Sequence, residues 1–451
     1  MPGPLCLTRF AAAGKTLPVN YSALAARVGR LGVTPVTGCP SECGRCDRID
    51  AVQRPTDSSH TTSTSTVASP TSLLSAPFLL VTLCTFAYFV SLGTLLTTLP
   101  KYVKEELQGG GVAIGVVVGV FSISAAVLRP WAGRLGDRRG RRVLVVGGCL
   151  IMAGSVAAYA LTDNLGVLIA LRAVSGIGEA AVFVGAATAV QDLAPPDRRG
   201  EAASFFSVAL YAGLAIGPIL GDRVVAAHGY KTMWLVSGGL SALAAVVGLK
   251  TPVGTTTEHR PATFLNHAAL RPGLILFLGV MPFTAFTGFL AVYGERIGLS
   301  QVGPVFASYA GGVLLIRIFG ARLPDRLGWS TASAIALGAA TVAGLVFALW
   351  ASVIGVYVAA FALSVGQSLL YPALFTAVID NAPDEERSHA VGTFSVFFDL
   401  AGGLGAPLLG AVVSLSSERG AFAVAAALSA GGFFALKTLR ASDARVQPVR
   451  S

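Results

Sequence analysis

The most informative segment of the chain reads Gly133-Arg-Leu-Gly-Asp137-Arg-Arg-Gly140-Arg-Arg142. It holds five arginines, one aspartate and three glycines, and an apolar run lies on either side of it. A second copy, Arg322-Leu-Pro-Asp325-Arg326-Leu-Gly328, lies 188 residues further on, also between apolar runs. The repeat predicts a chain made of two related halves.

The composition is that of a membrane protein. Of the 451 residues, 53% are hydrophobic and 12% are charged, whereas a soluble domain carries about 25% charged residues. The mean hydropathy of +0.69 is also too high for a surface that faces water. The net charge of +10 does not indicate a nucleic-acid partner, because the basic residues are spread over short loops. We therefore expect a polytopic α-helical protein in a lipid bilayer.

From residue 76 the chain contains twelve apolar runs of about 20 residues, the length that spans a bilayer as a helix. The predicted fold is all-α, with twelve transmembrane helices in two pseudo-symmetric six-helix bundles. The runs are roughly 77–99, 112–132, 143–162, 165–190, 202–222, 232–250, 272–294, 303–321, 331–350, 352–379, 389–414 and 418–438. The expected divisions are a disordered leader at 1–75, bundles at 76–250 and 272–440, a cytoplasmic linker at 251–271 and a tail at 441–451.

The distribution of lysine and arginine predicts the orientation. If the N-terminus is cytoplasmic, the cytoplasmic loops and tail carry 17 of these residues and the external loops carry 6. This asymmetry favours a multi-pass protein of the plasma membrane with both termini in the cytoplasm.

The leader contains a Cys-x3-Cys-x2-Cys spacing at Cys39, Cys43 and Cys46. The spacing resembles the cluster motif of radical S-adenosylmethionine enzymes, but no soluble barrel surrounds it, and we interpret it as a chance triplet. We expect no metal and no cofactor. An alternative hypothesis is that translation begins near Val67, which would make the leader an annotation artefact.

The repeat extends beyond the opening segment and includes charged, glycine and serine positions. It relates Arg129 to Arg317, Gly178 to Gly366, and Ser207 to Ser395, and after one inserted residue Gly213, Pro218 and Gly221 to Gly402, Pro407 and Gly410. Repeats of this kind place a substrate site between the halves, near the middle of the membrane.

At this point the chain resembles the major facilitator superfamily, over roughly residues 76–440. The resemblance implies a transporter that works by alternating access. Three motifs carry it: the loop between helices 2 and 3, with Gly133, Leu135, Asp137, Arg138, Gly140, Arg141 and Arg142; the helix 4 motif Arg172-x3-Gly176-x-Gly178; and the helix 5 motif Gly213-x3-Gly217-Pro218-x2-Gly221. Asp222 stands where the helix 5 motif usually has a second glycine.

The loop motif is predicted to act as a hinge and gate, with Asp325, Arg326 and Gly328 as its degenerate second copy. Asp137 can accept from backbone N–H groups at a helix start, and the resemblance implies that this start belongs to helix 11. The alternative is that the arginines are simple stop-transfer charges. Arg129 and Arg317 lie near helix ends, where snorkelling is a sufficient explanation.

The helix 5 motif has two interpretations. Proline removes a helix hydrogen bond, so Gly213, Gly217, Pro218 and Gly221 are expected to bend the helix. The alternative is ordinary close packing of small residues.

Three ionisable residues lie deep in the predicted spans, namely Arg172, Glu179 and Asp399. A charge buried in a bilayer is costly unless it is paired or neutralised. We therefore expect Glu179 or Asp399 to carry a coupled proton, with Arg172 pairing one carboxylate or an anionic substrate group. The alternative is a structural ion pair between Arg172 and Glu179, which lie seven residues apart on one helix face.

By resemblance, helices 1, 4, 7 and 10 would line the substrate cavity. The candidates are largely aromatic, which favours an amphipathic solute over a free sugar. They are Phe86, Tyr88, Phe89, Thr94, Ser175, Phe183, Phe283, Phe286, Thr287, Tyr293, Gln367 and Tyr371.

These observations favour a monomeric secondary transporter that couples protons to the export of a small amphipathic compound. A sugar or organic-anion symporter or uniporter of the same superfamily is the nearest alternative. A transport-dead membrane receptor is an alternative of another class. An enzyme is not expected, because the spans contain no constellation of metal ligands or nucleophiles, and no nucleotide-binding Gly-x4-Gly-Lys-Ser/Thr loop occurs.

Overall fold

The computed structural model describes residues 74–195, 198–251, 267–320, 326–382 and 387–446. Every regular element in these ranges is a helix. The helices are α2 (Ala76–Glu105), α3 (Gly111–Arg139), α4 (Arg141–Ala157), η1 (Ala158–Leu161), α5 (Leu165–Leu193), α6 (Arg199–Gly248), α7 (His267–Arg296), α8 (Gly303–Phe319), α10 (Trp329–Leu349), α11 (Val353–Asn381), α12 (Arg387–Gly403), α13 (Gly405–Leu415) and α14 (Glu418–Val446).

The predicted set of twelve spans is confirmed. In the described residues, ten segments are long and apolar enough to cross a membrane, and Gly303–Phe319 is a shorter apolar helix. One of the ten, α6, consists of two helices joined at Gly229, where the backbone is non-helical (φ 77°, ψ 176°). The helix bounds differ from the predicted runs mainly where a helix continues beyond its apolar stretch, as α2 and α14 do.

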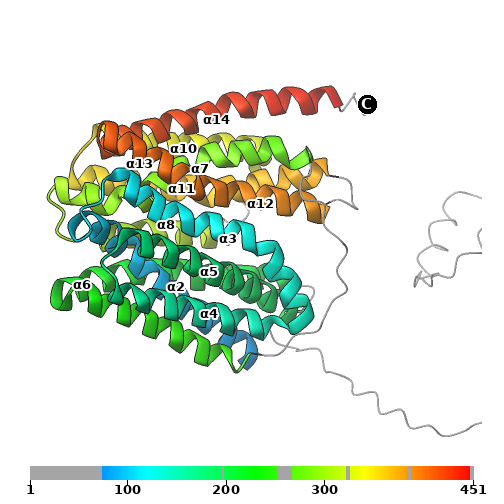
Figure 1. Ribbon diagram of the computed structural model, residues 1–451. Coiled ribbons are helices and arrows are strands. Elements are labelled where there is room, and N and C mark those ends of the chain that lie inside the picture. The colour runs from blue at the N-terminus through cyan, green and yellow to red at the C-terminus, as the bar shows by residue number, and fades with distance from the viewer. Residues whose placement is uncertain (1–73, 196–197, 252–266, 321–325, 383–386, 447–451) are drawn as a thin grey trace, which may run out of the picture. The chain divides into compact units, whose positions relative to one another are not determined.

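The helices group into an N-terminal bundle (α2–α6) and a C-terminal bundle (α7–α14). Within the first, α2 packs along α6, and α5 packs against α3 and α4. Within the second, α10 packs along α11 and α14, and α14 along α7. The bundles meet where α3 contacts α12 and α13, and where α6 contacts α8. Figure 1 shows α3 and α8 in the middle of the assembly, with the other helices of each bundle outside them.

Two glycines of the repeated motif lie at helix boundaries. Gly140 lies between α3 and α4, and Gly328 directly precedes α10; their φ angles are 87° and 74°, a conformation that residues with a Cβ rarely adopt. We call the end of the bundle where Gly133–Arg142 lies the motif end, and the other end the opposite end.

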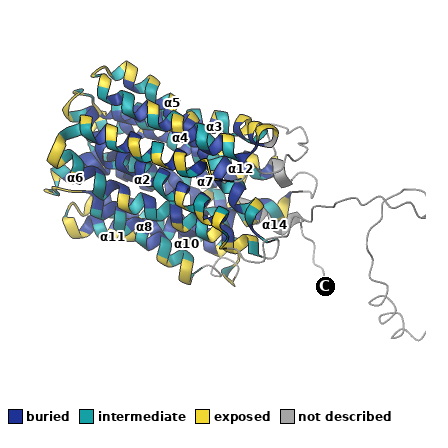
Figure 2. Ribbon diagram, turned by 90° about the horizontal axis from the view of Figure 1, so that it is seen from below, coloured by how far each residue is buried: buried dark blue, intermediate teal, exposed yellow. Residues whose placement is uncertain are grey.

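Figure 2 shows buried residues toward the helix contacts and exposed residues on the outside. Many of the exposed residues are large and apolar, as expected of a bundle that faces lipid. Several sequence predictions fall outside the described residues: the leader with its cysteine triplet, Asp325, the middle of the linker and the end of the tail. The side chain of Asp137 is also outside them. Its predicted contact with the start of helix 11, which is the run 389–414 and begins as α12 in the structure, therefore stays a prediction.

Candidate functional site

The charged centre of the structure is an ion-pair network that joins three helices and both bundles. Arg129 of α3 donates from Nη1 to Asp399 Oδ2 of α12 over 2.7 Å. Its Nη2 lies 3.4 Å from Glu179 Oε1 of α5. The guanidinium also stacks on Phe183, 4.8 Å from the ring centre. We call Arg129, Glu179 and Asp399 the central network.

The central network is shielded from solvent. The side chains of Glu179 and Asp399 are 8% and 7% exposed, and that of Arg129 is 22% exposed. One guanidinium faces two carboxylates, so the ionised network carries one uncompensated negative charge. A single proton would neutralise that charge. A net negative charge buried in this way is unfavourable unless it is compensated.

Arg129 is the residue that sequence reasoning missed. Its place near a helix end favoured snorkelling, but its side chain instead bonds two deep carboxylates. The sequence did contain a signal for a second buried cation, because two deep carboxylates, Glu179 and Asp399, were predicted with only one deep arginine, Arg172. Besides Arg172, the predicted spans of the N-terminal half contain one other arginine, Arg129, four residues before Gly133.

Arg172 does not pair with Glu179 in the structure, contrary to the structural alternative from the sequence. Its Nε donates to the carbonyl of Val117 over 3.2 Å, and its guanidinium lies 4.2 Å from the ring centre of Phe121. Its buried Nη1 has no hydrogen-bond partner within the described part of the chain. Arg172 therefore packs α5 against α3 and is separate from the central network.

Two predicted cavity residues lie close to the central network. Phe183 stacks on Arg129, and its ring also meets Phe206 of α6 edge to face. Tyr371 of α11 shares a hydrogen bond of 3.0 Å with Ser395, one turn before Asp399. Its ring meets Phe398 edge to face. These aromatic groups surround the network on the side of α6, α11 and α12.

The other predicted cavity residues lie in helix contacts. Ser175 is buried and bonded to the hydroxyls of Ser155 and Tyr159. Thr94 and Thr287 bond to backbone carbonyls of their own helices. Phe86 is half-buried, while Tyr88, Phe89 and Gln367 are buried. In the C-terminal bundle, Phe283 and Phe286 pack on Tyr309, and Tyr293 donates to the carbonyl of Phe347.

The helix 5 motif packs α6 closely against α2. A Cβ added at Gly213 would lie 2.7 Å from Phe89 Cβ, and one at Gly221 would lie 2.8 Å from the carbonyl oxygen of Thr94. Pro218 is buried within the same contact. These distances match the alternative of small-residue packing.

The bundles are in close contact at the opposite end, along a line of small residues. Gly111, Gly115 and Gly119 of α3 face Gly403 of α12 and Ala406 and Gly410 of α13. A Cβ at Gly111 would lie 2.6 Å from the carbonyl oxygen of Gly410, and a Cβ at Gly119 equally close to that of Gly403. We call these six residues the glycine seam. Because backbone meets backbone here, nothing larger than glycine fits on the α3 side.

Polar contacts add to the closure at the opposite end. Asp222 of α6 accepts from the backbone N–H of Gly303 over 2.6 Å, at the first residue of α8. Lys104 of α2 lies 2.9 Å from Glu295 of α7, and Lys101 lies 3.7 Å from it. All three contacts join the N-terminal bundle to the C-terminal bundle.

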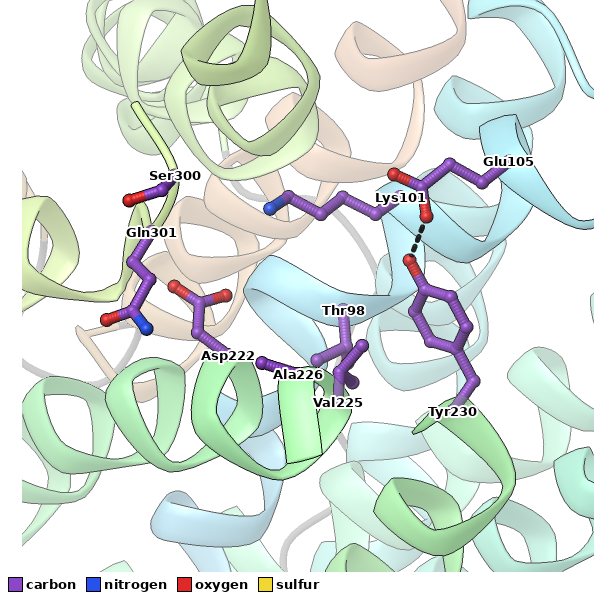
Figure 3. A pocket seen from close by; sticks show the side chains of 9 residues that line it. All are labelled: Thr98, Lys101, Glu105, Asp222, Val225, Ala226, Tyr230, Ser300 and Gln301. Atoms are coloured by element: carbon purple, nitrogen blue, oxygen red, sulfur yellow. Dashed lines mark hydrogen bonds between the residues drawn. The ribbon is translucent and has the colours of Figure 1, made fainter. Parts of the chain in front are cut away.

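A cavity of about 290 Å³ lies among these contacts. Figure 3 shows Lys101 and Asp222 facing it from the N-terminal bundle, opposite Ser300 and Gln301. At its rim the hydroxyl of Tyr230 donates to Glu105. Asp222, which stands where the helix 5 motif usually has a glycine, therefore caps the start of α8 in the other bundle. The helix dipole favours an anion at this position.

Replacing Asp222 with leucine is expected to loosen the opposite end. The change removes a charged cap on α8, worth about 1–2 kcal/mol, so opening should become roughly five- to thirtyfold more frequent. The measurement is the rate at which a membrane-impermeant maleimide modifies Thr98→Cys, a buried cavity residue. Glu106→Gln, which removes an exposed carboxylate at the same end, is the matched control. An unchanged rate with Asp222→Leu would contradict the capping role.

Comparison with known proteins places the chain in a family. The sequence profile of the Major Facilitator Superfamily matches residues 81–406 and 333–450. The chain therefore belongs to the Major Facilitator Superfamily, whose members are secondary transporters that carry small molecules across membranes.

Its relatives include an uncharacterized MFS-type transporter of Salmonella typhimurium, 29% identical over 355 residues, which cover 76% of this chain and 91% of the relative. The uncharacterized MFS-type transporter YhhS of Escherichia coli is 24% identical over 360 residues, covering 76% of this chain and 88% of YhhS.

Three solved structures share the fold. The nucleoside transporter NupG has a TM-score of 0.66 at 16% identity, over 81% of this chain and 99% of NupG. A bacterial homolog of the human lysosomal transporter Spinster, in an inward-facing and occupied conformation, has a TM-score of 0.66 at 14% identity, over 83% and 98%. The human organic anion transporter MFSD10 has a TM-score of 0.61 at 19% identity, over 80% and 98%. At these identities the likeness concerns the fold.

Proposed function

We propose that this transporter couples the movement of protons to the export of a small amphipathic compound, and that the central network is the coupling site. The observation that carries the proposal is the buried ion pair between Arg129 and Asp399, 2.7 Å long, which links the two bundles. Family membership supplies secondary transport, and the network supplies a group that can hold a proton.

The proposed coupling step follows from the charges of the network. In the ionised state Arg129 bonds Asp399 across the bundle interface and Glu179 within its own bundle. A proton on Asp399 removes the charge that holds α12 to α3, and Arg129 remains paired with Glu179. The bundles can then separate at this level. Loss of the proton restores the cross-bundle pair, so the protonation state and the bundle arrangement depend on each other.

The proposed orientation places the motif end in the cytoplasm, with both termini inside and the protein in the plasma membrane. The excess of lysine and arginine in the loops of that end supports it. The glycine seam and the Asp222 cap then lie outside, and the structure is closed toward the exterior. We propose that a monomer suffices, with residues 76–250 and 272–440 as the moving bodies.

The proposed gate at the motif end is the segment around Asp137, acting on the start of α12 when the transporter opens outward. This segment comprises the end of α3, Gly140 and the start of α4. In the described residues, Arg141 at the start of α4 lies 3.2 Å from Asp192 at the end of α5, and Arg142 donates to the carbonyl of Thr251. These contacts hold the segment to its own bundle. They support a rigid segment that moves together with the N-terminal bundle.

The aromatic side chains beside the network support an amphipathic substrate. Phe183, Phe206, Tyr371 and Phe398 present ring surfaces around a charged centre. Such a surface binds apolar and polar parts of one molecule together. The organic-anion alternative is favoured by a separate observation: Arg317 has no carboxylate within ion-pair distance among the described residues.

Proteoliposomes with an imposed pH gradient test the proposal. The probes are ethidium as an amphipathic cation, carboxyfluorescein as an amphipathic anion, and glucose. We expect the gradient to drive one amphipathic probe, and a protonophore to abolish its accumulation. Asp399→Asn should exchange the probe without gradient-driven accumulation, because this side chain can no longer bind and release a proton. Glu179→Gln should reduce coupling in the same direction.

Glu201→Gln is the matched control, since Glu201 is an exposed carboxylate that pairs with Arg198 outside the network. Normal proton coupling in both Asp399→Asn and Glu179→Gln would reject the central network as the coupling site. Gradient-driven glucose uptake, with no flux of either amphipathic probe, would reject the proposed substrate class.

A further inference from the structure

A second cavity lies between the bundles near the motif end. Its volume is about 390 Å³, and it is lined by α6 of the N-terminal bundle and by α8 and α11 of the C-terminal bundle. Serine side chains from α6 and α11 and aliphatic side chains form its wall, and among the described residues Arg317 of α8 is the one charged lining residue. The lining includes Ser204, Ser207, Val208, Leu314 and Ser368.

Arg317 is held in place by neutral groups only. Its Nη1 donates to Ser207 Oγ over 3.0 Å, and its guanidinium lies 5.1 Å from the ring centre of Tyr211. Its Nε is buried without a hydrogen-bond partner among the described residues. Among the described residues, no carboxylate lies within ion-pair distance of Arg317. In the part of the chain that the structure describes, this positive charge thus lies in the cleft without a counter-charge.

The internal repeat shows what has been lost at this position. Arg317 corresponds to Arg129 at the offset of 188 residues, and Gln367 corresponds to Glu179. The position of Asp399 corresponds to Leu210 or Tyr211, depending on where the inserted residue is placed. Arg129 meets two carboxylates, whereas the residues at the positions that correspond to them around Arg317 are uncharged. The Nε2 of Gln367 is also buried without a partner in the described ranges.

Arg317 lies half-buried in the last turn of α8, and an anion that enters the cleft would give its guanidinium a charge-assisted partner. We propose that the Arg317 cleft binds the carboxylate or phosphate head of an amphipathic anion, with the serine hydroxyls as further donors and the aliphatic wall against its chain. This inference rests on the proposed function, since it names the substrate class. It assigns the ligand the counter-charge that Glu179 and Asp399 provide to Arg129.

The anion has two possible sources, a transported solute or an anionic phospholipid of the surrounding bilayer. Both would present the same head group to Arg317. The experiment therefore measures binding of one defined probe in two lipid environments. It uses the full-length protein and no proton gradient, so it does not depend on coupling through the central network.

The test is calorimetric titration of octanoate into the protein in phosphatidylcholine nanodiscs, beside octyltrimethylammonium, octanol and empty discs. We expect saturable binding of octanoate that is weakened by about tenfold or more in Arg317→Gln, the loss of one charge-assisted contact. Arg317→Lys should bind octanoate better than Arg317→Gln, because lysine keeps the positive charge. It should bind less well than the wild type, because lysine lacks the planar guanidinium that can contact both carboxylate oxygens. Lys437→Gln removes an exposed charge elsewhere at the motif end and should bind as the wild type does.

A thermal melt of each variant shows that it is folded before the titration is interpreted. The lipid source is distinguished with discs that contain phosphatidylglycerol. The anion is a lipid if two results are obtained. Octanoate must bind more weakly in these discs, and native mass spectrometry must show phosphatidylglycerol retained by the wild type and lost in Arg317→Gln. Unchanged octanoate binding identifies a solute. Equal binding of octanoate and octyltrimethylammonium, or wild-type affinity in folded Arg317→Gln, would overturn the proposal.

The two proposals fail separately. If octanoate binds through Arg317 while Asp399→Asn and Glu179→Gln both couple normally, the anion site stands and the central network loses its proposed role. If octanoate binding does not depend on Arg317 while Asp399→Asn is uncoupled, the anion site is rejected and the central network keeps its proposed role.

Discussion

Arg129→Gln should destabilise the protein and stop transport. The change leaves Glu179 and Asp399 buried at 8% and 7% exposure without their cation. Removing one member of a buried ion pair costs about 3–5 kcal/mol, because the remaining charge has lost its partner. We expect a fall of that size in the free energy of unfolding, measured by denaturant titration in detergent. Gradient-driven flux should fall by more than about a hundredfold.

The source of this effect can be isolated by a second substitution. In Arg129→Gln combined with Glu179→Gln and Asp399→Asn, no buried charge remains in the network, and most of the stability should return without proton coupling. Arg134→Gln on the same helix, an arginine that lies over Trp131 at 5.5 Å, is the matched control. If Arg129→Gln unfolded at the same denaturant concentration as the wild type, the network would have no part in holding the bundles together.

Gly115→Leu should prevent the opposite end from closing. A Cβ at Gly115 would collide with the carbonyl oxygen of Ala406, and further side-chain atoms would enlarge the clash. Overpacking of this kind costs about 1–3 kcal/mol, which shifts the balance roughly 5- to 150-fold toward the open arrangement. Transport should fall accordingly, because a transporter that cannot close one side cannot complete its cycle.

The distance between spin labels measures this shift. Labels at the exposed positions Gln108 and Ser416 report on the two bundles at the opposite end, in a full-length variant whose four cysteines in residues 1–75 are serine. Gly115→Leu should lengthen the distance. Gly154→Leu is the control, since a Cβ there meets nothing within 4 Å. A distance distribution identical to the wild type in Gly115→Leu would show that the seam does not close the transporter.

The helical architecture was predictable from the sequence because its cause is local. Each span needs about 20 apolar residues, and this requirement is visible in the chain without knowledge of any contact. The turns at Gly140 and Gly328 were predictable for the same reason, since one residue type suits the backbone there. The predicted gap between 222 and 232 was too long, because the residues from Arg223 to His228 contain no helix breaker and α6 continues to Gly229.

The central network was only half predictable. Glu179 and Asp399 were recognisable as deep carboxylates, because burial of a charge is unfavourable wherever it occurs. Their partner was indicated only indirectly, by the excess of carboxylates over Arg172, because Arg129 and Asp399 are 270 residues apart and no periodicity relates them. The cap of α8 by Asp222 is similar, since an exception to a motif does not reveal which distant N–H group it meets. Contacts between bundles depend on tertiary packing, which no single segment encodes.

The lysine–glutamate contacts at the opposite end have a consequence for the response to salt. Lys104 is 37% exposed and Glu295 is 26% exposed, so dissolved ions can reach this pair. At an ionic strength of 0.15 M, the Debye length is about 8 Å, and it shortens further as salt rises. Screening will weaken this pair, while the low dielectric around Asp399 protects its contact with Arg129. The closure near Lys104 is therefore sensitive to ionic strength, and the pairing in the interior is not.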